Sequence, residues 1–313
     1  MIDFTKSGKS GERMLPLSLN LFGDVKLTHS VHGDIALPRK TQMLLAYLAK
    51  DGGSQLQRDL VASSVWHDRA EGQARHSLRQ CLFALSKSIG DDTASLVQAD
   101  RRYLSLNSDS VNVDTWRFEH LLAENAPDTM RQAVALYSAD FATGISYEDE
   151  LLDNWCAAER TRFRELCYDT LAKLSAHYTD IAKLDEAIEA ARRLVTLDSL
   201  REDGYRTLMR LLGRAGRRAE AIKQYSQCRE ILRLDLNVEP EAATTNLYSE
   251  IMGDSNKVAV EPELTAPSPD ADKHKQEISP VIANRGRVTL IVGLFLITAL
   301  AITMFWLLVG QPS

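Results

Sequence analysis

The stretch EGQARHSLRQCLFALSKSIG, Glu71 to Gly90, decides how the first part of this chain folds. A helix with about 3.6 residues per turn divides this stretch into two opposite faces. One face is apolar and consists of Ala74, Leu78, Cys81, Leu82, Leu85 and Ile89. The other face is basic and polar and consists of Arg75, His76, Arg79, Gln80 and Lys87. The apolar face predicts packing in a core, so the basic face is left for solvent or for a partner.

The chain as a whole is not basic, so any surface for an anionic partner has to be local. Its 313 residues carry a formal charge of -6 at pH 7, and 44% of them are hydrophobic, an ordinary share for a folded protein. From Leu37 to Leu106, ten lysines and arginines stand against seven acidic residues, which gives a local charge of +3. The length allows two domains of ordinary size.

The sequence lacks the residue spacings of common catalytic and metal sites. The four cysteines are widely separated with no Cys-x-x-Cys pair, and the seven histidines show no His-Glu-x-x-His spacing. We therefore expect buried thiols in a reducing compartment, no metal site and no cofactor. No nucleophile with a nearby base, pair of carboxylates or phosphate-binding loop is recognisable, so the chain is predicted not to be an enzyme.

Short strands and two further helices surround the helix predicted at 71–90. Alternating leucines predict strands within 15–36, with a turn at Gly33-Asp34. The other predicted elements are helices at 38–50 and 57–66 and strands at 95–99 and 103–107. Strands, three helices and a terminal hairpin are typical of a winged helix-turn-helix, whose third helix enters the DNA major groove while the hairpin wing follows the backbone.

This arrangement gives the basic face a partner, double-stranded DNA. Arginine can bind guanine through two hydrogen bonds, glutamine can bind adenine, and lysine meets phosphate as a point charge. Two arginines at the tip of the wing add phosphate contacts. The predicted DNA-binding residues are Arg75, His76, Arg79, Gln80, Lys87, Arg101 and Arg102. Phe83 shares this face, where it either touches a thymine methyl group or packs under the wing.

The first part of the chain resembles the OmpR/PhoB-type winged helix at the head of the Streptomyces antibiotic regulatory protein (SARP) family. That family commonly reads A-R-x-S-L-R at the start of the third helix, which Ala74-Arg75 and Ser77-Leu78-Arg79 match. The wing departs from the family pattern. It carries Arg101-Arg102 beside Tyr103 where the family usually has glycine, so its turn is expected to differ.

The second part of the chain, from Val113 to Met252, has a helical pattern with an internal repeat. Glu186-Ala187-Ile188 recurs as Glu220-Ala221-Ile222, 34 residues later, which is the period of tetratricopeptide (TPR) repeats. Small residues such as alanine let paired helices approach closely. Tyr205 and Tyr225 are predicted to lie in the core, and the concave surface of such a stack suits an unidentified protein or peptide effector.

The same helical part resembles the bacterial transcriptional activator domain (BTAD) that follows the winged helix in the SARP family. The resemblance is carried by 113–122, 208–240 and 247–251, and together with the winged helix it covers about 15–252. It implies that this region mediates homodimerisation or contact with the transcription machinery, such as RNA polymerase.

The C-terminal part of the sequence predicts a membrane anchor. Val288 to Gly310 holds no charged residue across 23 positions, which as a helix reaches about 34 Å, enough for the hydrocarbon core of a bilayer. Arg285 and Arg287 precede this stretch, so the positive-inside rule places the N-terminal domains in the cytoplasm of a bacterial cell, at the inner (cytoplasmic) membrane.

The expected protein is mainly α with a small β component. Its predicted parts are a disordered tail at 1–14, an OmpR-type winged helix at 15–110, a TPR-like activator domain at 111–252, a flexible linker at 253–287 and a transmembrane helix at 288–310. The expected function is a membrane-tethered, sequence-specific DNA-binding transcription regulator. The alternative is a membrane-anchored TPR scaffold or adaptor whose winged helix binds protein instead of DNA.

Overall fold

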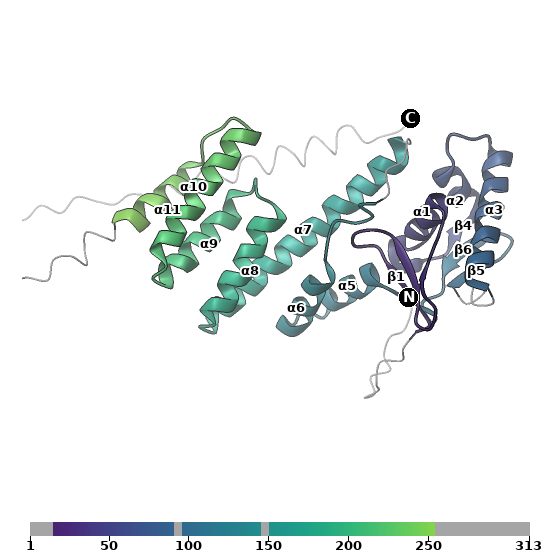
Figure 1. The fold of residues 1–313 in the computed structure, drawn as a ribbon, viewed down its shortest axis with the longest axis horizontal. Helices are drawn as coiled ribbons and strands as arrows, with labels where there is room; N and C mark the ends of the chain where they lie inside the picture. The colour runs from purple at the N-terminus through teal and green to yellow at the C-terminus, as the bar shows by residue number, and fades with distance from the viewer. Residues whose placement is uncertain (1–14, 91–95, 145–149, 254–313) are drawn as a thin grey trace, which may run out of the picture. The chain divides into compact units, whose positions relative to one another are not determined.

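The first sheet of the structure is built on alternating leucines. In the computed structural model, which describes residues 15–90, 96–144 and 150–253 (Figure 1), Leu17 and Leu19 are fully buried because alternate residues of a strand share a face. The strands are, in spatial order, β3 (Gly33–Ile35), β2 (Lys26–His29), β1 (Leu17–Asn20) and β7 (Val111–Val113). β1 is antiparallel to β2 and parallel to β7.

The turn between β2 and β3 lies at residues 30–32, earlier than the predicted Gly33-Asp34. The imidazole of His29 closes it, because its Nδ1 accepts hydrogen bonds from the backbone N–H groups of Val31 and His32 at 3.0 and 3.2 Å. Gly33 follows with a φ of 75°, a left-handed conformation that favours glycine, and it begins β3.

Three helices and a small second sheet complete the winged helix. The helices are α1 (Arg39–Leu48), α2 (Arg58–Val65) and α3 (Glu71–Ile89), with a short 3-10 helix η1 (Lys50–Gly53) after the first. The second sheet has the order β4 (Leu56–Gln57), β6 (Tyr103–Leu106) and β5 (Val97–Ala99). Pro38 stands directly before α1, and Gly90 ends α3 with a φ of 72°, so the predicted helix limits are confirmed to within about two residues.

The wing hairpin forms without a glycine. The carboxylate of Asp100 accepts hydrogen bonds from the backbone N–H groups of Arg102 and Tyr103, both at 2.6 Å, and the N–H of Asp100 donates to the carbonyl of Tyr103 at 3.1 Å. These backbone donors, that of Tyr103 first, hold the pKa of Asp100 below its usual value. Neither Arg101 nor Arg102 has a positive φ. A carboxylate acceptor therefore closes the turn at which the family pattern has glycine.

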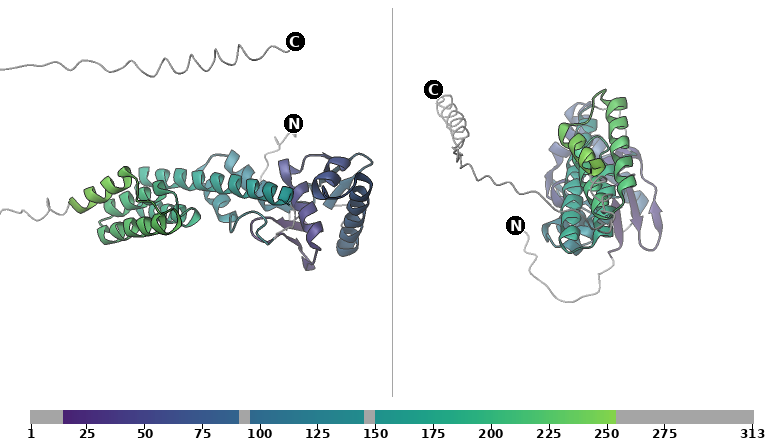
Figure 2. Two further views of the ribbon diagram at one scale, coloured as in Figure 1. Left: turned by 90° about the horizontal axis from the view of Figure 1, so that it is seen from above. Right: turned by 90° about the vertical axis from the view of Figure 1, so that its left-hand side faces the viewer.

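From Asp114 onward the named elements of the described residues are helices, and Phe141 adds an isolated antiparallel bridge to Phe22. The helices are α5 (Asp114–Ala123), α6 (Pro127–Leu136), α7 (Glu150–Asp180), α8 (Leu184–Leu197), α9 (Glu202–Arg214), α10 (Arg218–Asp235) and α11 (Ala242–Gly253). Helices from α7 onward lie side by side with their sequence neighbours (Figures 1 and 2).

The 34-residue period is confirmed by burial. Ala187 and Ala221 are both fully buried, which lets α8 pack on α7 and α10 pack on α9. Tyr205 is buried as predicted. Tyr225 is only partly buried and stacks on Tyr248 of α11, with 4.2 Å between ring centroids. The last helix therefore covers the final repeat pair.

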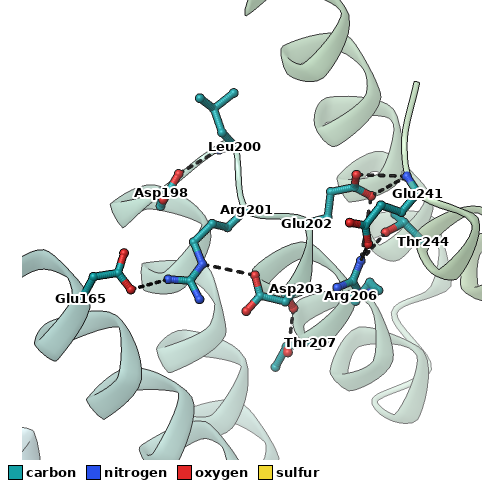
Figure 3. Close-up of polar contacts among 10 residues, drawn as sticks. All are labelled: Glu165, Asp198, Leu200, Arg201, Glu202, Asp203, Arg206, Thr207, Glu241 and Thr244. Carbon is teal, nitrogen blue, oxygen red and sulfur yellow. Dashed lines mark hydrogen bonds and ion pairs between the residues drawn. The ribbon is translucent and has the colours of Figure 1, made fainter. Parts of the chain in front are cut away.

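Two arginines connect the repeat helices through ion pairs (Figure 3). Arg201, in the residues between α8 and α9, contacts Glu165 of α7 at 2.8 Å. Arg206 of α9 contacts Glu241 at 2.9 Å, and the backbone N–H of Glu241 donates to the carboxylate of Glu202 at 3.0 Å. These contacts fix the start of α9 to α7 and to the segment that leads into α11.

The two predicted domains share one hydrophobic core. Its buried side chains run from Leu17 in β1 to Leu194 in α8. The ring of Phe22 contacts the rings of Phe118 and Phe163, with centroids 5.3 and 5.2 Å apart. Because β7 also pairs with β1, the boundary predicted at residue 110 falls where the two parts are joined by a sheet and by a core.

Asp114 makes the polar contact at this junction. Its carboxylate accepts hydrogen bonds from the backbone N–H groups of Leu21 and Phe22 at 2.9 Å and from its neighbour Thr115 at 2.8 Å. Burial raises the pKa of Asp114, and the hydrogen bonds from these backbone groups offset part of that effect. The first residue of α5 thus satisfies two amide groups at the end of β1.

The structure gives no support to a membrane location. Val288–Gly310 lies outside the described residues, as do 1–14 and 254–287. Among the residues that are described, no helix is long and apolar enough to cross a membrane. At 31 residues α7 has the length, but it carries charged side chains such as Arg164 and Lys173, which are costly inside a bilayer. The predicted single-pass location in the cytoplasmic membrane is therefore wrong on this finding.

Asp114→Ala should destabilise the whole folded unit. The substitution leaves the amide groups of Leu21 and Phe22 without their acceptor, so we expect the free energy of unfolding to fall by about 2–3 kcal/mol in denaturant titrations. Asp109→Ala, in an exposed turn, is the matched control and should change it by less than about 0.5 kcal/mol. Equal effects of the two substitutions would contradict the role given to Asp114.

Asp100→Ala should loosen the wing without unfolding the protein. We expect amide hydrogen exchange to accelerate by about tenfold at Arg102 and Tyr103, while Leu106 in the β5–β6 ladder stays protected. Because the folded pKa of Asp100 is lowered, its contribution is present above the unfolded pKa of about 3.9 and is lost as pH falls through the folded pKa. Unchanged exchange in the variant, measured by NMR, would show that the carboxylate does not hold the turn.

Candidate nucleic-acid interface

The third helix presents the two faces that its sequence predicts. Ala74, Leu78 and Leu85 are buried against α1 and α2. The predicted DNA-binding side chains of α3 are all exposed, namely Arg75, His76, Arg79, Gln80 and Lys87. No other described part of the chain covers this face, so a partner can reach it.

Two hydrogen bonds fix α3 against the rest of the winged helix. The guanidinium of Arg69, just before α3, donates to the hydroxyl of Ser77 at 2.6 Å. On the buried side, Thr41 of α1 and Cys81 of α3 share a hydrogen bond of 3.2 Å between Oγ1 and Sγ. Burial raises the pKa of the Cys81 thiol, so this cysteine is the buried, protonated group that the sequence predicts. The rotation of α3 about its own axis is therefore set by side chains at both edges of its apolar face.

A hollow of about 360 Å³ lies between the start of α3, the start of α2 and the wing. Its lining consists of Arg58, Asp59, Arg75, Leu78, Arg79 and Arg101. Four guanidinium groups stand against one carboxylate, so the lining carries a net charge of +3. The structure thus brings together three of the predicted DNA-binding residues, from α3 and from the wing. His76, Gln80, Lys87 and Arg102 are exposed outside this hollow.

Arg58 belongs to this cluster although the sequence did not single it out. Its guanidinium donates to the carbonyl of Asp100 at 3.1 Å, across 42 residues of sequence, and its backbone N–H donates to the carbonyl of Arg102 at 2.8 Å. Pairing of β4 with β6 places the start of α2 beside the wing. Arg58 therefore fixes the wing against α2 and adds a positive charge beside Arg101. In the sequence, Arg58 was recognisable only as a basic residue at the start of a predicted helix.

Arg75 is held by carboxylates of its own chain. Its Nε donates to Asp59 at 2.7 Å, and its Nη2 pairs with Glu71 one turn earlier on α3. The hydrogen bond to Asp59 is the main cause that raises the pKa of Arg75. The side chain is 48% exposed, yet both edges of its guanidinium are already occupied. The structure therefore differs from the sequence interpretation, in which Arg75 was open to a partner.

Arg79 and Arg101 are in the opposite situation. Within the described residues, no hydrogen bond or ion pair involves the side chain of either one, and both line the hollow. Arg79 follows Arg75 by one turn of α3 and so lies on the same face of the helix, nearer to its middle. These two guanidinium groups can accept an anionic partner without first leaving a carboxylate of the protein.

A second hollow, of about 420 Å³, lies among α7, α8 and the residues after α6. Asp140 there is bonded by Tyr137 and pairs with Arg164, while Arg193 donates to the carbonyl of Val134 at 2.9 Å. These polar side chains thus already bond other groups of the protein. The hollow identifies no ligand for the helical region, and the predicted protein or peptide effector stays a prediction.

Comparison with known proteins finds a family match for the helical part of the chain. Residues 113–252 match the bacterial transcriptional activator domain, a range that begins at the last residue of β7. The regulatory protein AfsR of Streptomyces griseus is 24% identical over 246 residues, which are 74% of this chain and 24% of AfsR. AfsR of Streptomyces coelicolor is 24% identical over 226 residues, 69% of this chain and 22% of that protein. The chain therefore spans about a quarter of the length of these curated relatives.

A solved structure shares the fold. EmbR of Mycobacterium tuberculosis, in complex with a low-affinity phosphopeptide, superposes with a TM-score of 0.56 at 17% identity and covers 77% of this chain and 66% of EmbR. At this identity the likeness concerns the fold alone, a winged-helix-like N-terminal part followed by a helical domain. Residues 113–252 thus match a bacterial transcriptional activator domain, and the two Streptomyces relatives are regulatory proteins.

Proposed function

We propose that this chain regulates transcription by binding operator DNA in a sequence-specific way through α3 and the wing. The observation that carries the proposal is the hollow in which Arg58, Arg79 and Arg101 converge beside an exposed helix. Nucleic-acid phosphates are the anions that such a cluster suits, and a single helix fits the major groove. The relationship to regulatory proteins supports the same function.

In this proposal, α3 and the wing have different roles in binding DNA. Arg79 and Gln80, near the middle of α3, bind base edges, since arginine suits guanine and glutamine suits adenine. Arg101 and Arg102 at the wing, supported by Arg58, bind phosphates and so set the position of the helix on the duplex. Lys87 extends the cationic face along α3 toward neighbouring phosphates, and His76 adds a polar contact on the same face.

The helical domain supplies the link to transcription in this proposal. Residues 113–252 match an activator domain, and stacked helical repeats offer extended surfaces for protein partners. We therefore assign self-association or contact with RNA polymerase to this region. The core that this region shares with the winged helix supports the assignment, because it connects a partner bound to the helical domain rigidly to the winged helix.

Binding of the full chain to duplex DNA should fall steeply with salt. Loss of one phosphate contact lowers the slope of log K against log salt concentration by about 0.9, so Arg101→Ala should reduce the slope by about one. Arg79→Ala should cost about 1–3 kcal/mol at the base pair that it contacts and weaken the preference there. Fluorescence anisotropy across a salt series measures both.

Arg131→Ala is the matched control for these substitutions. It removes an exposed arginine from α6 in the helical region and should leave the slope unchanged. If Arg131→Ala and Arg101→Ala alter the slope equally, the wing is not the phosphate-binding element. A response to salt that is flat for the unmodified chain would contradict DNA binding and would favour a scaffold whose winged helix binds protein.

Asp59→Asn should strengthen DNA binding by releasing Arg75. The substitution removes one of its two carboxylate partners, so we expect tighter binding, a slope steeper by about one and a larger loss on Arg75→Ala than in the unmodified chain. Asp68→Asn makes the same charge change at an exposed position before α3 and is the control. Equal gains from the two substitutions would mean that net charge, and not release of Arg75, is responsible.

A further inference from the structure

Phe83 is an apolar side chain left in the middle of the basic face of α3. It is 73% exposed, whereas the other phenylalanines within the described ranges are at most 5% exposed. Burial of a phenylalanine side chain is worth about 1.5–3 kcal/mol, so the fold forgoes that stabilisation at this position. The exposure also rules out one of the two explanations that the sequence left open, since Phe83 does not pack under the wing.

The surroundings of Phe83 suit a polyanion. Arg79 and Lys87 lie one turn to either side of it on α3, and His76 lies two turns before it. From residue 71 to residue 90 the sequence contains a single acidic side chain, Glu71, and that carboxylate is paired with Arg75 at the far end of the helix. A partner surface here has to be negatively charged and also offer an apolar contact.

The major groove of DNA meets both conditions, because the C5-methyl group of thymine projects into it between two lines of phosphates. Gln80 stands one turn before Phe83 on the same face, and a glutamine amide can bind adenine through two hydrogen bonds. Gln80 suits the adenine of an A·T pair and Phe83 suits the methyl group of its thymine, so the two side chains favour the same kind of base pair.

We propose that Phe83 contacts the thymine methyl group of an A·T pair in the operator and is a specificity-determining residue of α3. The inference rests on the proposed function, since it requires α3 to lie in the major groove. It adds a preference that phosphate contacts cannot supply, because phosphates are the same at every base pair.

Replacement of thymine by deoxyuridine tests this contact, since the two bases differ only in the methyl group. The full chain is first used to select its preferred site from a random duplex library, and each thymine of that site is then replaced singly. We expect one or two positions at which the dissociation constant rises about fourfold, the factor that one buried methyl-sized group is worth. With Phe83→Ala the same replacements should change it less than about 1.5-fold, and Phe83→Leu should restore part of the effect.

The controls separate this inference from the proposed function. Leu234→Ala removes a side chain that is 65% exposed on α10 and should leave the deoxyuridine profile of the unmodified chain intact. A site bound with sequence preference but insensitive to deoxyuridine, or equally sensitive in Phe83→Ala, overturns the role of Phe83 alone. Failure of the chain to select any sequence overturns the proposed function with it. If Phe83→Ala instead abolishes self-association in sedimentation and leaves the profile unchanged, a second copy is the partner and the inference fails.

Discussion

Burial of the apolar face of α3 is the constraint on which the interface depends. Leu78 and Leu85 are almost completely buried, and each contributes about 1.5–3 kcal/mol. Because successive residues of a helix are rotated by about 100°, a turn of α3 by one residue would expose Leu78 and press Arg79 against α1 and α2. An unpaired charge buried there costs several kcal/mol. The core therefore determines which side chains face outward, and only then does the chemistry of those side chains matter.

Arg75 and Arg79 differ because only Arg75 is paired with carboxylates, Asp59 and Glu71, among the described residues. Like charges at about 4 Å repel by about 1 kcal/mol even in water, and by more beside a protein surface. Asp59 and Glu71 relieve this repulsion at Arg75, which leaves the remaining positive charge on Arg58, Arg79 and Arg101. The hollow therefore keeps a net positive charge in the folded protein. A bound anion can reduce the repulsion among its guanidinium groups.

Local patterns in the sequence predicted local structure well. The faces of α3, the strands of the wing and the 34-residue period all depend on residues within one or two turns or on one repeat, and burial confirms them. What the sequence did not predict depends on contacts between distant segments. Arg58 reaches the wing through pairing of β4 with β6, and the bond between Arg75 and Asp59 joins two helices whose spacing no periodicity reveals. The membrane location rested on composition alone, in a segment outside the described residues.

The junction between the winged helix and the helical domain joins the two parts into one rigid unit. α5 begins at Asp114, whose carboxylate bonds the backbone at the end of β1, and the strand just before it pairs with β1 along its length. A displacement of α5 relative to the winged helix would break those bonds or carry β1 with it. Close-packed interiors transmit such strain because they have few voids to absorb it. A partner bound to the helical domain can therefore act on the winged helix through the core itself, without a flexible linker between them.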